Sequence, residues 1–327
     1  MGTPAIAVIT TANAGIGTGH LRRSLTLVDE LVRAGASVGL WVYAGDPAMA
    51  GWVSPQVART VIDPALTLEQ ALAAGGRYPV MVIDSYDVHD GHLIPLVKAG
   101  CRVLVMDDLA DRPLTATWLL NSCVEDPSVY RGLTGAALLL GPSCALLRPQ
   151  FRDLPPRVAS GEIRRVLLSF GGSDVLRLNE RAMRWLDAVG AGWDIRVIAG
   201  PLTTSAAWTS VSHRVEQLRD VRDMVEQMRW ADLAITAAGQ TTFELAATGC
   251  PAVCLKVADN QRFTGELAAR RGYALVADAR HTDDAAITDL VRRIVDDPAA
   301  RIAMGAAGAA AVDGHGAVRV AETLLAA

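Results

Sequence analysis

The sequence lacks the features that mark membrane-spanning, nucleic-acid-binding and secreted proteins. Its longest apolar runs are the size of strands and are interrupted by charges, well short of the ~20 residues that cross a membrane. The 327 residues carry a formal net charge of −4 and contain no run of like charges, which argues against broad attraction to nucleic acid or acidic lipid. The first residues have no basic segment and predict a strand, not a signal peptide. We therefore expect a cytoplasmic protein.

Cysteine is scarce and follows neither a metal-binding nor a disulfide pattern. The five cysteines are odd in number and include no Cys-x-x-Cys pair. Cys250 and Cys254 lie close together in sequence, but no matching pair of histidines accompanies them. We therefore expect reduced, mostly buried thiols and no bound metal.

What the sequence does contain is a regular alternation of short apolar segments with amphipathic segments of helix length. This alternation predicts an α/β protein with parallel sheets covered by helices on both faces. The expected strands are Ala5–Thr10, Ser37–Tyr43, Val80–Asp84, Arg102–Met106, Trp118–Asn121, Arg165–Phe170, Asp194–Ala199, Leu233–Thr236, Pro251–Leu255 and Ala274–Val276. The expected helices are Leu21–Arg33, Leu66–Ala74, His92–Ala99, Asn179–Val189, Met224–Trp230, Thr241–Thr248, Arg262–Arg271 and Asp283–Val295, followed by an alanine-rich helix and a final helix.

The alternation runs twice, and a polar, proline-bearing segment separates the two halves. We expect a Rossmann-like domain over residues 1–153, a linker over 154–164 and a second Rossmann-like domain over 165–327, with the last helix placed where it can cross back onto the first domain. Each half opens with a strand that runs into a glycine-rich turn. We expect the two doubly wound domains to face a central cleft, with a ligand at the carboxyl ends of their strands.

A glycine-rich loop in the first half leads into the first helix. Gly15, Gly17 and Gly19 let the backbone pass close to a ligand, and His20 follows at the start of the helix. The positive end of the helix dipole disfavours an imidazolium there, so we expect a neutral ring that accepts a proton as a general base. The alternative is a histidine that only caps or packs the helix.

Polar residues also end two buried strands of the first half. Asp84 and Tyr86 follow one strand, and Asp107 and Asp108 follow the next. Tyr86 is the second candidate catalytic residue, because its hydroxyl can give a proton or a hydrogen bond to a departing oxygen. Single aspartates in such places often bond the backbone amides of a neighbouring loop, so we interpret Asp84 and Asp107 as structural.

The second half opens with a candidate phosphate-binding turn. Gly171 and Gly172 come directly after a strand and precede Ser173. Without a Cβ in the way, backbone amides at this turn can approach a phosphate. The alternative is that the glycines serve only the sharp turn from strand to helix.

Another buried strand of this half ends in small residues, Ala237 to Gly239, and Gln240, Thr241 and Thr242 then cap the helix that follows. The open N-terminus of that helix offers N–H donors and the positive end of a dipole, and the two hydroxyls add donors for a diphosphate. Glu244, one turn further, can accept hydrogen bonds from a ribose diol. Alternatively, Thr241 is only a cap and Glu244 only an acid in the first turn.

Three hydrogen-bonding side chains follow the next strand, at a strand-to-helix corner. They are Asp259, Asn260 and Gln261. We expect this corner to lie on the same edge of the sheet as Gly239, so these residues are candidates for binding the same ligand. Capping at the surface would explain Asp259 alone.

Together these segments resemble a known family, the UDP-sugar hydrolases of pseudaminic acid biosynthesis (the PseG and SpsG type), which are related to the MurG-type glycosyltransferases. The matching stretches run in order along nearly the whole chain: IGTGHLRRSLTL, VIDSY, VLVMDDL, LLNS, LLGPSCALLRPQF, LLSFGGSD, TAAGQTTFELAATGCPAV, ADNQ and DGHGAVRV. The resemblance implies a GT-B fold and a UDP-sugar donor held mainly by the second domain. It also implies that His20 activates the incoming nucleophile with Tyr86 nearby, without a metal or other cofactor, and with inversion of the anomeric centre.

The sequence departs from that family just ahead of the glycine loop. The family usually carries an Arg-x-Asp-x-Ser pattern there, and this sequence has Ile9, Thr11 and Asn13 at those positions. The charged pair is therefore absent from the domain that meets the sugar and the nucleophile. Asn13 is retained with Gly17 and Gly19 as a candidate substrate-binding residue.

This departure leaves the nucleophile open. We expect an enzyme that breaks the anomeric C–O bond of a UDP-sugar and transfers the sugar to a small acceptor (a nucleobase, an amine or a hydroxyl) in bacterial sugar or natural-product biosynthesis. The alternative is a hydrolase that uses water. A third possibility is a non-catalytic nucleotide-sugar-binding protein, against which His20, Tyr86 and Gln240–Glu244 argue. We expect no nucleic acid or membrane partner, and a monomer or homodimer.

Overall fold

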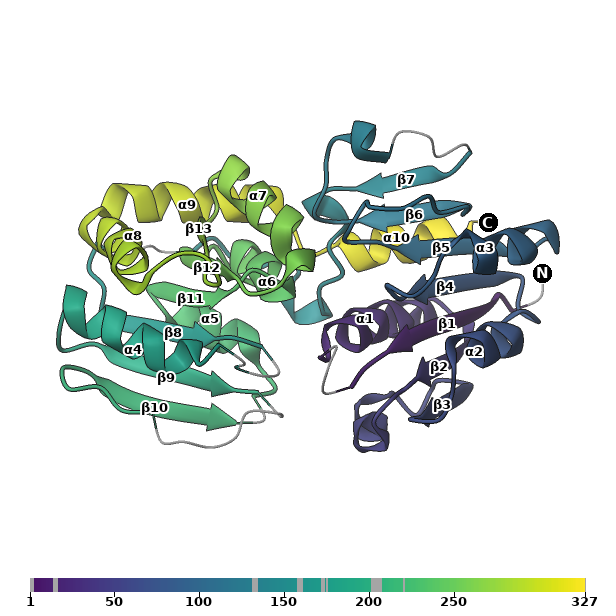
Figure 1. Cartoon of the computed structure of the whole chain (residues 1–327), viewed down its shortest axis with the longest axis horizontal. Coiled ribbons are helices and arrows are strands. Elements are labelled where there is room, and N and C mark those ends of the chain that lie inside the picture. Colours follow the sequence, from purple (N-terminus) through teal and green to yellow (C-terminus); the bar gives the residue numbers. More distant parts are fainter. Residues whose placement is uncertain are drawn as a thin grey trace. The chain divides into compact units, whose positions relative to one another are not determined.

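A computed structural model describes residues 3–13, 17–130, 135–157, 161–171, 174, 176–200, 208–219 and 221–326. The chain forms two compact units: unit 1 comprises Met1–Arg148 and His315–Ala327, and unit 2 comprises Pro149–Gly314. The division at Arg148 precedes the expected boundary at residue 153, and the last helix belongs to unit 1 (Figure 1). Within the described ranges, no helix is both long and apolar enough to span a bilayer.

Unit 1 is built on a seven-stranded parallel sheet with the strand order β3-β2-β1-β4-β5-β6-β7. Its strands are β1 (Ala5–Thr11), β2 (Ser37–Tyr43), β3 (Arg59–Asp63), β4 (Val80–Asp84), β5 (Arg102–Met106), β6 (Trp118–Asn121) and β7 (Ala137–Leu140). Its helices are α1 (Gly19–Arg33), α2 (Leu68–Gly75), α3 (Asp90–Lys98) and α10 (Gly316–Leu325).

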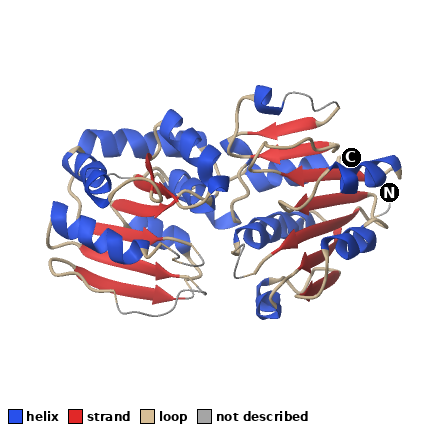
Figure 2. Cartoon of the chain, viewed as in Figure 1, coloured by secondary structure: helices blue, strands red, loops and turns tan. Residues whose placement is uncertain are grey.

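Helices cover both faces of this sheet, because side chains alternate between the faces along each strand. Ile6 and Val8 of β1 pack with residues of α1 and α10 in one core cluster. Ala7 and Ile9 of the same strand pack with residues of α2 and α3 in another. The helices on the two sides of the strands are seen in Figure 2. This double burial explains why the central strands are continuous apolar runs in the sequence.

Unit 2 is built on a six-stranded parallel sheet with the order β10-β9-β8-β11-β12-β13. Its strands are β8 (Arg165–Ser169), β9 (Asp194–Ala199), β10 (Arg214–Arg219), β11 (Leu233–Ala237), β12 (Ala252–Lys256) and β13 (Leu275–Asp278). Its helices are α4 (Leu178–Val189), α5 (Met224–Trp230), α6 (Gln240–Thr248), α7 (Arg262–Arg271), α8 (Asp284–Asp296) and α9 (Pro298–Ala311). Residues of α4 and α8 share one core cluster with the sheet, and α6 packs against α9.

Every strand and helix expected from the sequence is present, but three strands were not expected. These are β3, β7 and β10, and each lies at the edge of its sheet. Their residues are half-buried or exposed; β3 and β10 include polar and charged residues, whereas β7 is an apolar run of only four residues.

Each sheet reverses its direction of growth once. In unit 1 the chain continues from β1 toward β3 on one side and places β4 on the other side of β1. In unit 2 the same reversal occurs between β8 and β11. Open α/β sheets bind ligands at the carboxyl ends of the strands beside such a switch point.

Candidate active site

The first candidate site begins in the loop after β1. α1 starts at Gly19 with no side-chain cap, and His20 lies in its first turn. Gly17 has a φ of 85°, the left-handed backbone that favours glycine, and its N–H donates to the Asn13 carbonyl at 2.8 Å. Asn13 and Gly17 thus close the base of the loop. The predicted loop residue Gly15 lies outside the described residues.

The His20 ring is held by a buried carboxylate. Its Nδ1 lies 2.6 Å from Oδ1 of Asp84, the last residue of β4; Asp84 is 0% exposed and His20 is 5% exposed. Arg23, on the next turn of α1, donates through Nε to Oδ2 at 2.8 Å and through Nη2 to Oδ1 at 2.6 Å. The Ser24 hydroxyl donates to Oδ2 at 3.1 Å. Both oxygens of this buried carboxylate therefore have two partners each.

These partners keep Asp84 ionised. Burial alone would raise its pKa, but the charges and hydrogen bonds of Arg23 and His20 hold the pKa of Asp84 well below its usual value. Burial alone would lower the pKa of Arg23, and the carboxylates of Asp108 and Asp84 hold it well above the usual value. An ionised carboxylate only accepts hydrogen bonds, so Nδ1 of His20 is the donor. In the neutral ring, Nε2 then carries the lone pair that a general base needs.

A second arm leads from Arg23 to Tyr86. Nη1 of Arg23 donates to both oxygens of Asp108 at 2.8 Å, and the Tyr86 hydroxyl donates to Oδ2 of Asp108 at 2.7 Å. The Tyr86 ring meets the His20 ring edge-on, with 4.4 Å between ring centroids. In this arrangement the Tyr86 proton is directed at Asp108, and the donation to a departing oxygen that the sequence suggested stays a prediction.

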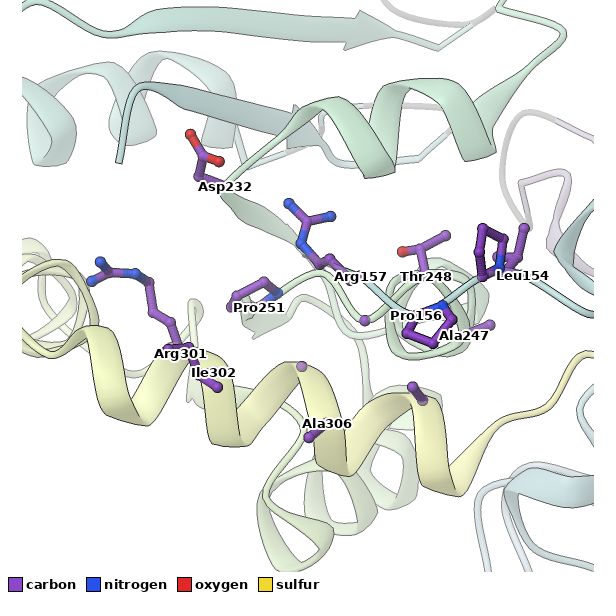
Figure 3. Close-up of a pocket in the computed structure, with 14 residues that line it drawn as sticks. Leu154, Pro156, Arg157, Asp232, Ala247, Thr248, Pro251, Arg301, Ile302 and Ala306 are labelled. Atoms are coloured by element: carbon purple, nitrogen blue, oxygen red, sulfur yellow. The ribbon is translucent and has the colours of Figure 1, made fainter. Parts of the chain in front are cut away.

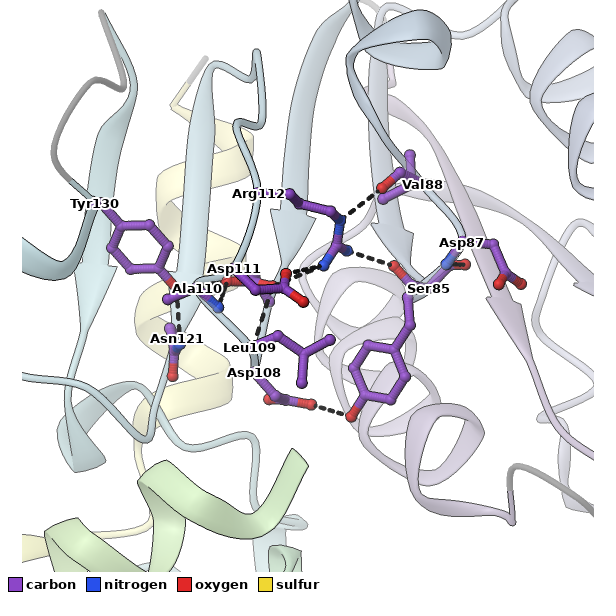
Figure 4. A network of polar contacts seen from close by, with 12 residues as sticks. Ser85, Asp87, Val88, Asp108, Leu109, Ala110, Asp111, Arg112, Asn121 and Tyr130 are labelled. Atoms are coloured by element: carbon purple, nitrogen blue, oxygen red, sulfur yellow. Dashed lines mark hydrogen bonds and ion pairs between the residues drawn. The ribbon is translucent and has the colours of Figure 1, made fainter. Parts of the chain in front are cut away.

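The loops that carry these residues are tied together by a further network (Figure 4). Arg112 donates through Nε to the Val88 carbonyl at 2.9 Å and through Nη2 to the Ser85 carbonyl at 3.5 Å. Asp107 accepts the Tyr130 hydroxyl at 2.8 Å and two backbone N–H groups of the loop that follows it. Asp107 therefore has the structural role predicted for it.

Sequence reasoning missed the partnership of Asp84, Arg23 and Asp108. Asp84 was expected to be structural, whereas it bonds the candidate base directly, because β4 lies beside β1 and ends next to α1. The spacing of His20 and Arg23, three residues apart on a helix, places both on one face and was a readable signal. That one arginine joins two carboxylates depends on the β1-β4-β5 order, which the sequence does not state.

The positions where the resembling family carries its charged pair face the interior here. Ile9 is fully buried among the core residues of the α2 and α3 face, and Thr11 is 1% exposed at the end of β1. The Asn13 side chain donates to the Ala44 carbonyl at 3.4 Å. These three residues add no charge to the surroundings of His20.

The second candidate site lies at the switch point of unit 2. Gly171 follows β8 with a φ of 81° and is exposed, and Gly239 follows the neighbouring strand β11. The other members of the predicted turn, Gly172 and Ser173, lie outside the described residues. Backbone at the ends of these two strands is thus presented without side chains where a ligand is expected.

The start of α6 has no side-chain cap. Gly239 is its N-cap, so Thr241 is not the cap that the sequence offered as an alternative; Gln240 and Thr241 are half-buried in the first turn. The first N–H groups of a helix have no partner one full turn back, and here the N–H of Thr242 donates to the Gly239 carbonyl at 3.0 Å. Thr242 is 1% exposed and its hydroxyl donates to Sγ of Cys254 at 3.6 Å. The Thr242 side chain therefore turns inward against β12, whereas the sequence suggested that its hydroxyl binds a diphosphate.

Gln261 lies beside this helix end. Its Nε2 is 3.9 Å from the position that a Cβ on Gly239 would occupy, and its Oε1 accepts the backbone N–H of Val257 at 2.8 Å. The bond to Val257 fixes the side-chain amide with its NH2 toward Gly239. The structure thus brings together two of the residues predicted to bind the donor.

The remaining residues that were predicted to bind the UDP-sugar differ in their exposure to solvent. Asp259 is exposed and accepts Nη1 of Arg280 at 2.6 Å, which fits the surface role offered as its alternative. Asn260 is half-buried in the same short turn, and Glu244 is half-buried one turn into α6.

A cavity of about 230 Å³ lies at the opposite edge of the unit 2 sheet (Figure 3). Among its lining residues, Asp232 precedes β11 and Pro251 precedes β12, so it opens beside the amino ends of these strands. Its two arginines are occupied by backbone: Arg157 donates to the carbonyls of residues 228 and 231, and Arg301 to those of residues 161 and 294. This cavity is separate from the predicted donor site.

The cysteines and acidic residues give no indication of a metal centre. In the part of the chain that the structure covers, no three His, Cys, Asp or Glu side chains gather closely enough to hold an ion. All five cysteines are free and four are buried, as the sequence predicted. Burial raises the pKa of Cys250 to about 11 and that of Cys254 to about 12.

Known proteins resemble the chain at low sequence identity. No family model matches the sequence. It is 22% identical over 276 residues to an uncharacterized protein of Methanocaldococcus jannaschii, covering 79% of this chain and 56% of that protein. It is 26% identical over 192 residues to the spore coat polysaccharide biosynthesis protein SpsG of Bacillus subtilis, covering 56% of this chain and 57% of SpsG. The chain thus spans little more than half the length of these relatives.

A shorter match and two solved structures define the fold. A stretch of 108 residues is 30% identical to the UDP-N-acetylglucosamine–N-acetylmuramyl-(pentapeptide) pyrophosphoryl-undecaprenol N-acetylglucosamine transferase of Geobacter sulfurreducens, covering 32% of this chain and 30% of the transferase. The structure of MurG from Acinetobacter baumannii matches with a TM-score of 0.72, 15% identity and coverage of 99% of this chain and 100% of MurG. The calicheamicin glycosyltransferase CalG4 matches with a TM-score of 0.64 and 16% identity, covering 100% and 98%. The chain has the GT-B fold of two Rossmann-like domains.

Proposed function

We propose that the protein transfers a sugar from a UDP-sugar to a small acceptor, with inversion at the anomeric carbon and release of UDP. The observation that carries the proposal is the His20–Asp84–Arg23 arrangement at the switch point of unit 1, which equips His20 as a base. The class is supported by relatives named as a polysaccharide biosynthesis protein and a UDP-N-acetylglucosamine transferase, and by glycosyltransferases of the same fold.

In the proposed reaction, Nε2 of His20 takes a proton from the acceptor O–H or N–H group. The acceptor atom attacks C1 of the sugar from the face opposite UDP, and the C1–O bond breaks with its electron pair leaving on the β-phosphate. Proton transfer turns the His20 ring into an imidazolium, and the ionised Asp84, 2.6 Å from Nδ1, stabilises that charge. General-base catalysis of this kind contributes on the order of 10²- to 10⁴-fold to turnover.

Unit 2 is proposed to bind the nucleotide. The N–H groups at the start of α6, next to Gly239, would hold the diphosphate, and the helix dipole favours the negative charge that develops as UDP leaves. The Gln261 amide beside Gly239 adds a donor, and Glu244 would accept the ribose hydroxyls. Because the helix end supplies this stabilisation, we propose that the reaction needs no metal or other cofactor.

Transfer is favoured over hydrolysis by the surroundings of His20. The Arg and Asp that the resembling hydrolases carry ahead of the glycine loop are replaced by Ile9 and Thr11, and both of these side chains are buried. No charge from these positions is therefore available to orient a water molecule. Hydrolysis remains the alternative that the following experiment separates.

The test is incubation of the full chain with a panel of UDP-sugars, with and without nucleobase, amine and sugar-alcohol acceptors, in the presence of EDTA. UDP and the sugar product are followed by chromatography. We expect UDP release that depends on one acceptor class and is unaffected by EDTA. Free sugar formed without an acceptor would establish the hydrolase instead. The proposal fails if no UDP is released and calorimetry detects no UDP binding, whereas UDP binding without turnover would indicate a binding protein.

A further inference from the structure

The role of Arg23 extends beyond holding one carboxylate. Its guanidinium lies between Asp84 and Asp108 and donates to all four of their oxygens at 2.6 to 2.8 Å. The arginine side chain is 14% exposed, and the two carboxylates are 0% and 12% exposed. Its Nη2 also lies 3.3 Å from Nδ1 of His20. Arg23 and the His20 ring thus share a single oxygen, Oδ1 of Asp84.

This sharing bears on the charge of the His20 ring. Among the described residues, the charged and titratable groups around the ring and its partners are Asp84 at the end of β4, Tyr86 in the loop that follows, Asp108 after β5, and Arg23 on α1 itself. A buried carboxylate is stable only if a positive charge compensates it. With a neutral ring, Arg23 and the two carboxylates carry a net charge of −1, and removal of Arg23 would leave two carboxylates with no arginine between them. Without Arg23, His20 would be the remaining group able to supply that charge.

We propose that Arg23 is a positioning residue that keeps His20 in its neutral, proton-accepting form and, through Asp108, holds Tyr86 against the ring. This inference rests on the proposed function of His20 as the base. It replaces the helix dipole, to which the sequence pointed, with a specific ion-pair network as the main reason for a neutral ring. A lysine cannot substitute, because one ammonium cannot reproduce the planar fork that donates to both carboxylates.

The test compares four variants in the assay described above. Arg23→Ala is expected to lose about 100-fold in turnover at pH 7, with the acidic limb of the pH–rate profile moved to higher pH. Added guanidinium ion should restore turnover with saturation and move the limb back. Arg23→Lys keeps the positive charge but loses the planar fork, so its limb should move less than that of Arg23→Ala, and guanidinium should not rescue its turnover. Arg22→Ala is the matched control, because Arg22 is the exposed neighbour whose guanidinium lies over Trp52, 4.5 Å from the ring centroid.

A fourth variant tests the sign of the effect. Asp108→Asn removes one negative charge from Arg23, so more of its positive charge acts on Asp84 and the ring, and the acidic limb is expected to move to lower pH. Opposite shifts in the Arg23 and Asp108 variants would support charge control, since general disruption of the site has no reason to reverse sign. Shifts in the same direction, or an unshifted limb in Arg23→Ala, would overturn the inference.

A second measurement separates this inference from the proposed function. The protonation of the His20 ring is followed by 15N NMR in the wild type and in Arg23→Ala, with His20→Ala used for assignment. Easier protonation of the ring in Arg23→Ala supports the inference even if the wild type turns over no UDP-sugar. An inactive wild type counts against the proposed function alone, whereas identical ring titrations count against the role of Arg23.

Discussion

The two units present their switch points in different ways. At the switch point of unit 1, polar side chains join the carboxyl ends of β1, β4 and β5: His20, Asp84, Arg23 and Asp108 form one hydrogen-bonded network with Tyr86. At the switch point of unit 2, the corresponding positions after β8 and β11 are glycines and an uncapped helix end. The same topology thus carries a network of charges in one unit and exposed backbone in the other.

The difference matches the two tasks of the proposed reaction. Moving a proton requires a base whose charge and tautomer are fixed, and a buried circuit around His20 supplies both. Holding a diphosphate requires several N–H donors that can approach closely, and backbone without side chains supplies them. Side-chain substitutions should therefore affect unit 1 through chemistry and unit 2 through steric access, which the following predictions test.

Removing the base should give the largest effect. We expect His20→Ala to lower turnover by about 10²- to 10⁴-fold, because no other group replaces the proton acceptor. UDP affinity measured by calorimetry should change by no more than about twofold. The corresponding change in binding free energy is well below the 1.4 kcal/mol of a tenfold change. The control is His281→Ala, because His281 is exposed beyond β13. Equal turnover in the two variants would show that His20 is not the catalytic base.

Neutralising Asp84 should affect both stability and turnover. Breaking a buried ion pair costs about 3–5 kcal/mol, so Asp84→Asn should be less stable by roughly that amount in urea unfolding at pH 7. The pKa of Asp84 is lowered in the folded state, so its contribution is fully present above its unfolded value of about 3.9 and is lost as the pH falls below it. The difference between variant and wild type should therefore shrink below about pH 4.

The control for this prediction is Asp111→Asn. Asp111 pairs with Arg112 at 2.8 Å, but its side chain is 57% exposed, so the change should be about 0.5 kcal/mol or less at either pH. Turnover of Asp84→Asn should fall by about 10²- to 10³-fold, because the amide no longer fixes the donor nitrogen of His20. A pH-independent stability difference would mean that Asp84 is not ionised through its contacts with Arg23 and His20.

The fold was largely predictable because its central strands have a recognisable sequence pattern. Strands buried on both faces, such as β1, β4 and β11, are continuous apolar runs, and helices such as α1 show one apolar face. Two edge strands, β3 and β10, were not predicted because their partly exposed positions accept polar residues, as in the RVEQLR segment of β10, and the third, β7, is an apolar run of only four residues. Sequence patterns reflect burial. They therefore predict strands least well at the edges of a sheet, where burial is incomplete.

The candidate site was predictable only in those features that depend on residues close together in the sequence. The glycine loop, His20 and the uncapped start of α6 are each encoded within a few neighbouring residues. The contact between His20 and Asp84 joins residues 64 positions apart and follows from the pairing of β1 with β4. The inward turn of Thr242 depends on Cys254 of β12 in the same way. Pairings between distant segments decide these roles, and one sequence does not specify them.

The next largest effect is expected when ligand access to the backbone at Gly239 is blocked. A Cβ there would meet only Nε2 of Gln261, at 3.9 Å, and the backbone is not left-handed, so Gly239→Ala should fold with unchanged thermal stability. The methyl group would stand beside the N–H donors of α6, and losing one bond to a charged phosphate costs about 1.5–3 kcal/mol. We expect UDP affinity to fall by about 10- to 100-fold in calorimetry. Gly161→Ala, also with open space at its Cβ position, should bind UDP as the wild type does.

The smallest effect should come from Thr242, and its direction separates the sequence pattern from the structure. If its hydroxyl served a diphosphate, Thr242→Val would weaken UDP binding. The side chain instead donates to Cys254, whose pKa burial raises to about 12, so the thiol stays protonated as a weak acceptor. We expect Thr242→Val to leave UDP affinity unchanged and to alter stability in urea by about 1 kcal/mol or less, because one buried hydrogen bond is lost. A tenfold loss of affinity would instead indicate that the Thr242 hydroxyl binds the diphosphate. Unit 2 would then hold the ligand through side chains as well as backbone.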